Sequence, residues 1–352
     1  MSRHKYAVGL VGVTGYTGME MLRCLLHHPD FKLTTVTSRQ ESGKTIARLF
    51  PQLQGTPLAD VTVSEPDVDQ LAQDCDLVFL AVPHGTAMHM AAALVHKGVK
   101  VVDLSADFRL KSREAFECWY NCPHEAPDLL ESAVYGLPEL YAADIAKARL
   151  VANPGCYPTS VLLGLCPALQ AGLVHSQGIV ADSKSGASGA GRGAKVGTLF
   201  CEVSDTFKAY GLGTHRHTPE IDQEASRISG ESIQISFNPH LLPINRGILT
   251  TLYTMAREET RIEDLHQAFA AFDAEHPWIR LQPQGVLPEL KNVRGTMYCD
   301  IGLVLDKRTG RAIIVSAIDN LCRGASGQAL ANANLMCGLP LTTGLDLPAL
   351  VP

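Results

Sequence analysis

The feature that most constrains the fold is a glycine-rich turn near the N-terminus, GVTGYTG, which connects an expected strand to an expected helix. The apolar run 7–13 is rich in β-branched residues, and residues 19–26 carry apolar side chains at helical spacing. Residues 31–37 return to the alternation of a strand. A strand, a helix and a second strand in this order predict a parallel, doubly wound sheet.

Glycines in such a turn allow main-chain N–H groups to approach a pyrophosphate and allow the helix to pack closely on the strand. Because the turn follows the first strand and opens the first helix, we predict a dinucleotide site, with a purely structural turn as the alternative. The predicted residues are Gly12, Thr14, Gly15, Tyr16, Thr17 and Gly18.

The end of the second strand indicates which dinucleotide binds. NAD sites place Asp or Glu there, whereas a 2′-phosphate is held by hydroxyl and guanidinium donors. This chain has Ser38 and Arg39 at that position. We therefore predict NADP, with both residues in its site; a solvated loop position for Arg39 is the alternative.

The pattern of elements changes near the middle of the chain. Strand-like runs at 76–83 and 99–107 flank a helical segment at 86–96 and continue the α/β pattern. After Pro154, strand-rich runs outnumber helices, which is typical of an α+β domain. A length of 352 residues also favours two domains.

Charge and cysteine content exclude several classes of function. The formal net charge is −6 without a long Lys/Arg cluster, so we expect a small-molecule substrate and no nucleic acid or membrane partner. The N-terminal apolar run predicts a strand instead of a leader peptide. Ten scattered cysteines suit free thiols in the cytoplasm. The cluster Cys118, Cys122 and His124 lacks a matching second pair, so no metal site is expected.

One cysteine lies where a turn meets a helix, in NPGCYPTS. Cys156 follows Pro154 and Gly155 and precedes a helix expected at 159–169, whose N-cap we place within 158–160. The positive end of the helix dipole lowers the pKa of a thiol toward the thiolate, the nucleophile of covalent catalysis. Cys156 is therefore the predicted nucleophile, with an inert buried cysteine as the alternative.

A nucleophilic cysteine usually needs a base. The segment YGLGTHRHTPEI offers His215 and His217 on either side of Arg216. An imidazole can exchange protons near neutral pH, and the guanidinium can orient an anion. The residues alone leave open which histidine is the acid/base, and a surface loop with two chance histidines is the alternative.

Motifs along almost the whole chain resemble the N-acetyl-gamma-glutamyl-phosphate reductases, the arginine-biosynthesis members of the aspartate-semialdehyde dehydrogenase group. The motifs are GVTGYTG, NPGCYPT, SGASGAGR, HRHTPEI, NPHLLPINRGIL and IDNLCRGASGQALANAN. Little matches between about residues 109 and 135.

The resemblance implies an α/β fold of the glyceraldehyde-phosphate/aspartate-semialdehyde dehydrogenase type and a homodimer or homotetramer. The implied domains are an NADP-binding Rossmann domain at 1–154, completed by a C-terminal helix at 321–352, and an α+β catalytic and oligomerisation domain at 155–320. It also implies Cys156 as nucleophile, His217 as acid/base, and Asn320 beside the cofactor.

The implied reaction is the NADPH-dependent reduction of an acyl phosphate through a thioester on the cysteine. Its substrate carries a phosphate and a carboxylate, so guanidinium groups and main-chain nests are expected around it. Ser185 and Gly186 are added to the predicted cofactor site. The predicted substrate-binding residues are Arg109, Asn153, Arg192 and His215.

Other functions stay open from the sequence. The same chemistry could act on aspartyl phosphate or on the amino-adipyl homologue of lysine synthesis. A cysteine hydrolase would leave the dinucleotide turn unexplained. A non-catalytic NADP-binding sensor or structural subunit would not need Cys156.

Overall fold

The computed structural model describes residues 5–351, and within it the chain forms two compact units. One unit comprises Met1–Pro154 with Ala325–Asp346, and the other comprises Gly155–Gly324 with Leu347–Pro352. The prediction that all of 321–352 joins the first unit is wrong at its two ends. Near the C-terminus, the Leu350 N–H donates to Arg294 O at 2.9 Å, and this hydrogen bond ties the last residues to the second unit.

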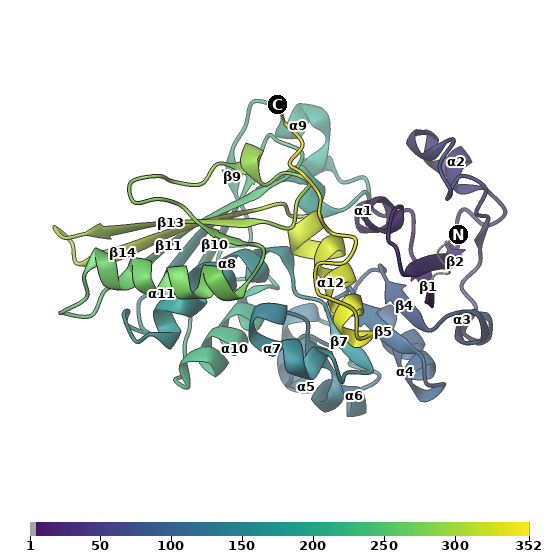
Figure 1. Cartoon of the computed structure of the whole chain (residues 1–352), viewed down its shortest axis with the longest axis horizontal. Helices are drawn as coiled ribbons and strands as arrows, with labels where there is room; N and C mark the ends of the chain where they lie inside the picture. Colours follow the sequence, from purple (N-terminus) through teal and green to yellow (C-terminus); the bar gives the residue numbers. More distant parts are fainter. Residues whose placement is uncertain (1–4, 352) are drawn as a thin grey trace. The chain divides into compact units, whose positions relative to one another are not determined.

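The first unit contains a seven-stranded parallel sheet in the order β3-β2-β1-β4-β5-β7-β6 (Figure 1). The strand order changes direction between β1 and β4, and ligands of such sheets bind at the carboxyl ends of the strands at this point. The strands are β1 (Tyr6–Val11), β2 (Phe31–Thr37), β3 (Val63–Ser64), β4 (Leu77–Leu80), β5 (Lys100–Asp103), β6 (Val134–Tyr135) and β7 (Leu150–Ala152).

Helices cover this sheet, and its central strands are apolar for that reason. All four residues of β4 are buried, as expected of a parallel strand covered on both faces. The C-terminal helix α12, drawn in yellow in Figure 1, packs against α1, α7 and β5. The helices are α1 (Tyr16–Leu25), α2 (Ile46–Leu49), α3 (Val68–Asp74), α4 (Ala87–His96), α5 (Arg113–Tyr120), α6 (Asp128–Ser132), α7 (Pro138–Ile145) and α12 (Gly327–Met336).

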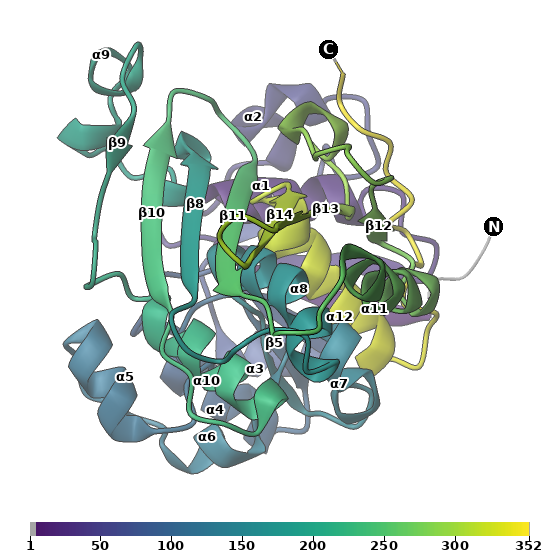
Figure 2. The same ribbon diagram turned by 90° about the vertical axis from the view of Figure 1, so that its left-hand side faces the viewer.

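The second unit contains a mixed seven-stranded sheet in the order β12-β13-β14-β11-β8-β10-β9. Figure 2 shows β10, β8 and β11 side by side; β8 runs parallel to β10 and antiparallel to β11. The strands are β8 (Val180–Gly186), β9 (Lys208–Ala209), β10 (Ser236–Leu242), β11 (Ile248–Met255), β12 (Ile279–Leu281), β13 (Cys299–Asp306) and β14 (Arg311–Ile318).

Helices α8, α10 and α11 of the second unit pack on one face of its sheet. Helix α8 contacts β11 and β14, and α10 and α11 pack on α8 (Figure 1). Along β11, buried residues alternate with half-buried ones, so the opposite face is only partly covered by residues 5–351; we call it the open face. The helices are α8 (Cys156–Gln170), α9 (Phe200–Val203), α10 (Thr218–Ser229) and α11 (Ile262–Glu275).

The start of α8 differs from the prediction. We expected an N-cap within 158–160, but the helix begins at Cys156 with Gly155 as its N-cap. Pro158 is tolerated because the first turn of a helix has no internal acceptors for its N–H groups. The nucleophile candidate is therefore the first helical residue, closer to the positive end of the dipole than expected. None of the helices within residues 5–351 is long and apolar enough to cross a membrane.

Candidate active site

The three glycines of the N-terminal turn meet different requirements. Gly12 has φ +88°, and a Cβ there would lie 2.3 Å from Ala81 O. A Cβ on Gly18 would lie 2.5 Å from Val13 O, so α1 packs directly on the end of β1. At Gly15, in contrast, a Cβ would meet no atom closer than 3.8 Å. The turn is therefore closely packed at Gly12 and Gly18 and has an open side at Gly15.

The open side of the turn lies at the N-terminus of α1. Gly15 is the N-cap, Tyr16 is the first helical residue, and the first turn of α1 contains no acidic side chain. Main-chain N–H groups and the helix dipole thus favour an anion there, so the turn fits a pyrophosphate. Thr17 O accepts a hydrogen bond from Ser326 Oγ at 2.7 Å, which attaches the turn to the start of α12.

Ser38 and Arg39 directly follow β2, at the same carboxyl edge of the sheet. Ser38 is buried, and its Oγ accepts the N–H of Gln40 at 3.4 Å. Arg39 is exposed. A hydroxyl held in place and an exposed guanidinium at the end of the second strand suit a 2′-phosphate.

In the second unit, the start of α8 is joined to the start of α10. The Gly155 N–H donates to Glu220 Oε1 at 2.8 Å, and both groups are buried. Helices α8 and α10 also pack along each other. This contact brings the N-terminus that carries Cys156 beside the N-terminus that carries His217, the N-cap of α10.

A tight turn after β14 contacts Cys156 from another direction. The buried Asp319 carboxylate accepts hydrogen bonds from Arg246 Nη2 at 2.8 Å and from two main-chain N–H groups just beyond it, at 2.8 and 2.7 Å. The turn brings Gly324 so close that a Cβ there would lie 2.7 Å from Cys156 Cβ. Only glycine fits at this position against Cys156.

The two histidines of HRH lie around the ring of Tyr157, the residue after Cys156. The Tyr157 ring centroid is 5.6 Å from that of His215 and 6.0 Å from that of His217. Burial and the positive charge of Arg216 lower the pKa of His215 to about 4. His215 is therefore neutral at pH 7 and is unsuited to hold an anion by charge.

Tyr157 and Tyr210 were not predicted as site residues. Their hydroxyl oxygens lie 2.9 Å apart, and Tyr157 also donates to His240 O at 3.3 Å. Burial and negative charge on Cys156 raise the pKa of Tyr210 to about 12, and burial likewise raises that of Tyr157. Both phenols stay protonated. The position of Tyr157 next to Cys156 was the only available sequence signal.

Asn320, Ser185 and Gly186 lie together at one end of the second sheet. Asn320 Oδ1 accepts the N–H of Gly247 at 2.7 Å, and its Nδ2 donates to Ser188 Oγ at 2.9 Å. The Gly186 N–H donates to Gly247 O at 2.9 Å. Ser185 is buried, whereas Arg192 lies in an exposed loop beyond them.

Arg109 and Asn153, two predicted substrate-binding residues, are buried in the first unit. Arg109 Nε donates to Asn153 O at 2.8 Å. Asn153 Nδ2 donates to Ala325 O at 3.1 Å, and its Oδ1 accepts from Asn332 Nδ2 at 3.0 Å. These bonds hold the main chain three residues before Cys156.

The cysteine cluster of the first unit does not form a ligand set. His124 is buried with its Nε2 2.7 Å from Asp107 O, while Cys118 is exposed. Among residues 5–351, these side chains do not gather within metal-binding distance of one another.

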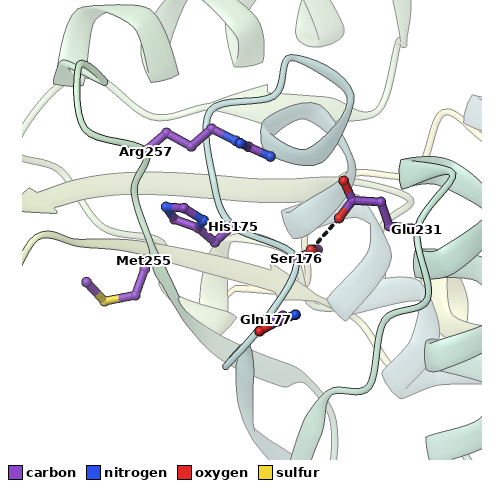
Figure 3. Close-up of a pocket in the computed structure, with 6 residues that line it drawn as sticks. All are labelled: His175, Ser176, Gln177, Glu231, Met255 and Arg257. Atoms are coloured by element: carbon purple, nitrogen blue, oxygen red, sulfur yellow. Dashed lines mark hydrogen bonds between the residues drawn. The ribbon is translucent and has the colours of Figure 1, made fainter.

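A hollow of about 530 Å³ lies in the second unit, lined by His175, Ser176, Gln177, Glu231, Met255 and Arg257 (Figure 3). Met255 is the last residue of β11, whereas Ile248, the first, pairs with Ser185 and Ile318. The hollow therefore lies at the end of the sheet opposite Asn320. The Glu231 side chain points to Ser176 and accepts a hydrogen bond from its hydroxyl group.

Two family models match the chain. Residues 7–148 match the semialdehyde dehydrogenase NAD binding domain, and residues 156–320 match the semialdehyde dehydrogenase dimerisation domain. Among solved structures, the fold is similar to aspartate semialdehyde dehydrogenase II of Vibrio cholerae, solved with ASA. The TM-score is 0.73 at 18% identity, over 96% of this chain and 99% of that one. Aspartate semialdehyde dehydrogenase of Candida albicans, solved with NADP, gives a TM-score of 0.69 at 16% identity, covering 94% and 98% of the two chains.

Curated relatives are much closer in sequence. The N-acetyl-gamma-glutamyl-phosphate reductase of Geobacter sulfurreducens is 50% identical over 346 residues, covering 98% of this chain and 99% of the relative. That of Alkalilimnicola ehrlichii is 50% identical over 345 residues with the same coverage. Identity at this level over nearly the whole length, with both domain models matched, shows that the chain belongs to the N-acetyl-gamma-glutamyl-phosphate reductase family of semialdehyde dehydrogenases.

Proposed function

We propose that this chain reduces N-acetyl-gamma-glutamyl phosphate to N-acetylglutamate semialdehyde and phosphate with NADPH, as a step of arginine biosynthesis. The observation that supports this most directly is the position of Cys156 as first residue of the buried helix α8, beside the N-terminus of α10 with its two histidines. The reductase names of the relatives at 50% identity support the choice of substrate.

The Cys156 thiolate attacks the acyl carbonyl carbon, an S–C bond forms, and the C–O bond to phosphate breaks. This substitution leaves a thioester and inorganic phosphate. When bound, NADPH supplies the hydride that reduces the thioester carbon. The resulting thiohemiacetal oxygen exchanges its proton with His217, and the C–S bond breaks to release the aldehyde and restore the thiolate.

Several groups around Cys156 support its reactivity. Its place at the positive end of the α8 dipole stabilises the thiolate. The Gly155 N–H is already bonded to Glu220, so it is not the donor that stabilises the oxyanion. N–H groups further into the first turn of α8 remain the proposed donors for that oxygen.

For NADP, the proposed site is the open side of the glycine turn with Ser38 and Arg39. Ser185, Gly186 and Asn320 are proposed for the same cofactor. For the substrate, Arg192 is the proposed cation, because its loop is exposed. Arg109 and Asn153 act in this proposal through the main chain that leads to Cys156.

The test is an assay in the reverse direction. The purified protein receives N-acetylglutamate semialdehyde, phosphate and NADP, and NADPH absorbance is followed beside a Cys156→Ser variant. NADPH formation that is lost in the variant supports the proposal. Reaction with aspartate semialdehyde or the amino-adipyl homologue alone would overturn the substrate. NADP binding without any reaction would favour a sensor.

A homodimer or homotetramer is proposed as the working form. The open face of the second sheet and the match of residues 156–320 to a dimerisation domain support self-association. Exposed apolar side chains, among them Phe200 and Phe207, add apolar surface in the same unit. A cytoplasmic location is proposed as well, because the cysteines are free thiols.

A further inference from the structure

The imidazole of His215 makes a hydrogen bond that fixes its protonation. Its Nδ1 accepts the main-chain N–H of His217 at 3.1 Å. A ring nitrogen that accepts a hydrogen bond carries no proton, so the proton of the neutral ring is on Nε2. The same hydrogen bond holds the N-cap residue of α10, which is His217 itself.

The start of α10 explains why this acceptor is needed. In a capping box, a Glu at N3 accepts the main-chain N–H of the N-cap residue. Helix α10 has Glu220 at N3, but the Glu220 carboxylate accepts the N–H of Gly155 at 2.8 Å. His215 Nδ1 takes over the N-cap N–H of His217. Two acceptors thus lie at the start of α10. Glu220 accepts the N–H of Gly155, and His215 accepts the N–H of His217.

Aromatic rings hold His215 in this orientation. Its ring centroid lies 5.6 Å from Tyr157 of α8, 5.6 Å from Tyr210 and 5.2 Å from Phe237 of β10, each near perpendicular or tilted. The titratable groups that face it are the two phenols and His217, and Arg216 adds a positive charge beside it. Burial and that charge lower the pKa of His215 to about 4, so the acceptor persists across the neutral range.

We propose that His215 is a positioning residue: as a neutral imidazole protonated on Nε2, it fixes the main chain of His217 and thereby the position of the acid/base. Its role in turnover rests on the proposed function, in which His217 exchanges the proton. It replaces the substrate-binding role predicted for His215 from the sequence.

Two substitutions separate the effect of the hydrogen-bond acceptor at residue 215 from the effect of its aromatic packing. His215→Asn keeps an acceptor, because Asn Oδ1 can occupy the place of Nδ1. His215→Phe keeps an aromatic ring in the cage and removes the acceptor. We expect His215→Phe to lose about 100-fold in kcat with an unchanged KM for NADP, since small displacements of a catalytic group have effects of this size. His215→Asn should keep most of the wild-type kcat.

Equal losses in the two variants, or wild-type kcat in His215→Phe, would overturn the proposal. Neutron diffraction of the wild-type protein at pH 7 gives a second measurement that needs no turnover and no variant. Deuterium on His215 Nε2 alone supports the proposal, and deuterium on Nδ1 contradicts it. Because this result does not depend on the substrate, a failure of the reductase assay would leave the His215 proposal separately tested.

Discussion

At the residue scale, the position of Cys156 depends partly on the missing side chain of a glycine. Gly324 approaches Cys156 more closely than any residue with a side chain could, because a Cβ there would overlap Cys156 Cβ. The turn that carries it is held by the buried Asp319 carboxylate and its hydrogen bonds. Side-chain chemistry at Cys156 therefore depends on a main-chain contact that no side-chain motif describes.

Replacing Gly324 by Ala should displace Cys156 or the turn, because the added methyl group would lie 2.7 Å from Cys156 Cβ and 3.1 Å from its Cα. We expect kcat to fall by about 100-fold, the size of effect that a misplaced reacting group produces. Steady-state kinetics in the reverse direction measure it. Gly193→Ala is the control, because a Cβ there meets nothing within 4 Å. Equal activity of both variants would contradict this role of Gly324.

At the element scale, α8 lies against its sheet through small residues at helical spacing. Ser160 Oγ donates to Thr250 Oγ1 at 2.8 Å and lies 2.9 Å from Ser316 Oγ. One turn later, a Cβ on Gly164 would lie 2.9 Å from Leu252 Cδ1. Because residues four apart share a helix face, this contact line leads back to Cys156. The close approach of α8 to the sheet therefore fixes the distance of Cys156, the proposed nucleophile, from the sheet.

Ser160→Ala should destabilise the second unit, because it leaves buried hydroxyls on the sheet without one of their partners. The expected loss is about 1–3 kcal/mol in the free energy of unfolding. Chemical denaturation followed by circular dichroism measures the loss. Ser132→Ala, at an exposed site on α6, serves as the control. A Ser160→Ala variant as stable as the wild type would show that the hydroxyl network contributes nothing.

A second element-scale feature is a buried carboxylate at the end of β5. Burial, and then the charge of Asp107, raise the pKa of Asp103 from 3.8 to about 7. Between these values, the folded state keeps a proton that the unfolded state has lost. Stability therefore falls as the pH rises through this window and levels off above it.

Asp103→Asn removes this titration. The difference in free energy of unfolding between wild type and variant should change by at most about 1.4 kcal/mol per pH unit between pH 4 and 7. The wild type becomes less stable relative to the variant as the pH rises. Denaturation series at several pH values measure it. Taking the difference between the two proteins cancels the contribution of titrating groups that do not interact with Asp103. Asp107 is coupled to Asp103, so the measured difference belongs to this pair of carboxyl groups. A difference that is independent of pH would contradict a raised pKa for Asp103.

At the scale of the whole molecule, the chain combines two units with different sheets. The first carries the parallel sheet and the glycine turn, and the second carries Cys156, the histidines and an open sheet face. On that face, Leu249, Thr251 and Tyr253 of β11 are half-buried, and their neighbours on the other face are buried. Apolar and aromatic side chains on an open sheet face suit contact with a second copy of the chain.

Tyr253→Glu should weaken self-association, because a charge buried in an interface without a partner is unfavourable. We expect a smaller assembly in light scattering after size exclusion, at the same protein concentration as the wild type. The control Gln54→Glu adds the same charge at an exposed position of the first unit. If Tyr253→Glu assembles like the wild type, the sheet face is not the contact surface.

Much of the fold could be predicted because local patterns carry it. The strand at Phe31–Thr37 and the helix ending at His96 agree with the structure in type and in nearly all bounds, since their apolar periodicity matches the faces they bury. The start of α8 was misplaced because Pro158 and Ser160 resemble cap residues, and the extended backbone of Gly155 is visible only in the structure.

By itself, the sequence determined the class of fold, the glycine turn and the residue types at the site, because periodicity, turn chemistry and thiol reactivity are local properties. Only the tertiary structure decided which residues hold the main chain and side chains of the candidate site in place. Glu220 on Gly155 and Gly324 against Cys156 are contacts between segments that folding brings together, as are the contacts of the His215 ring with Tyr157 and Phe237. Such contacts depend on how α8, α10 and the turn after β14 pack, and packing is a property of the whole unit that no single motif contains.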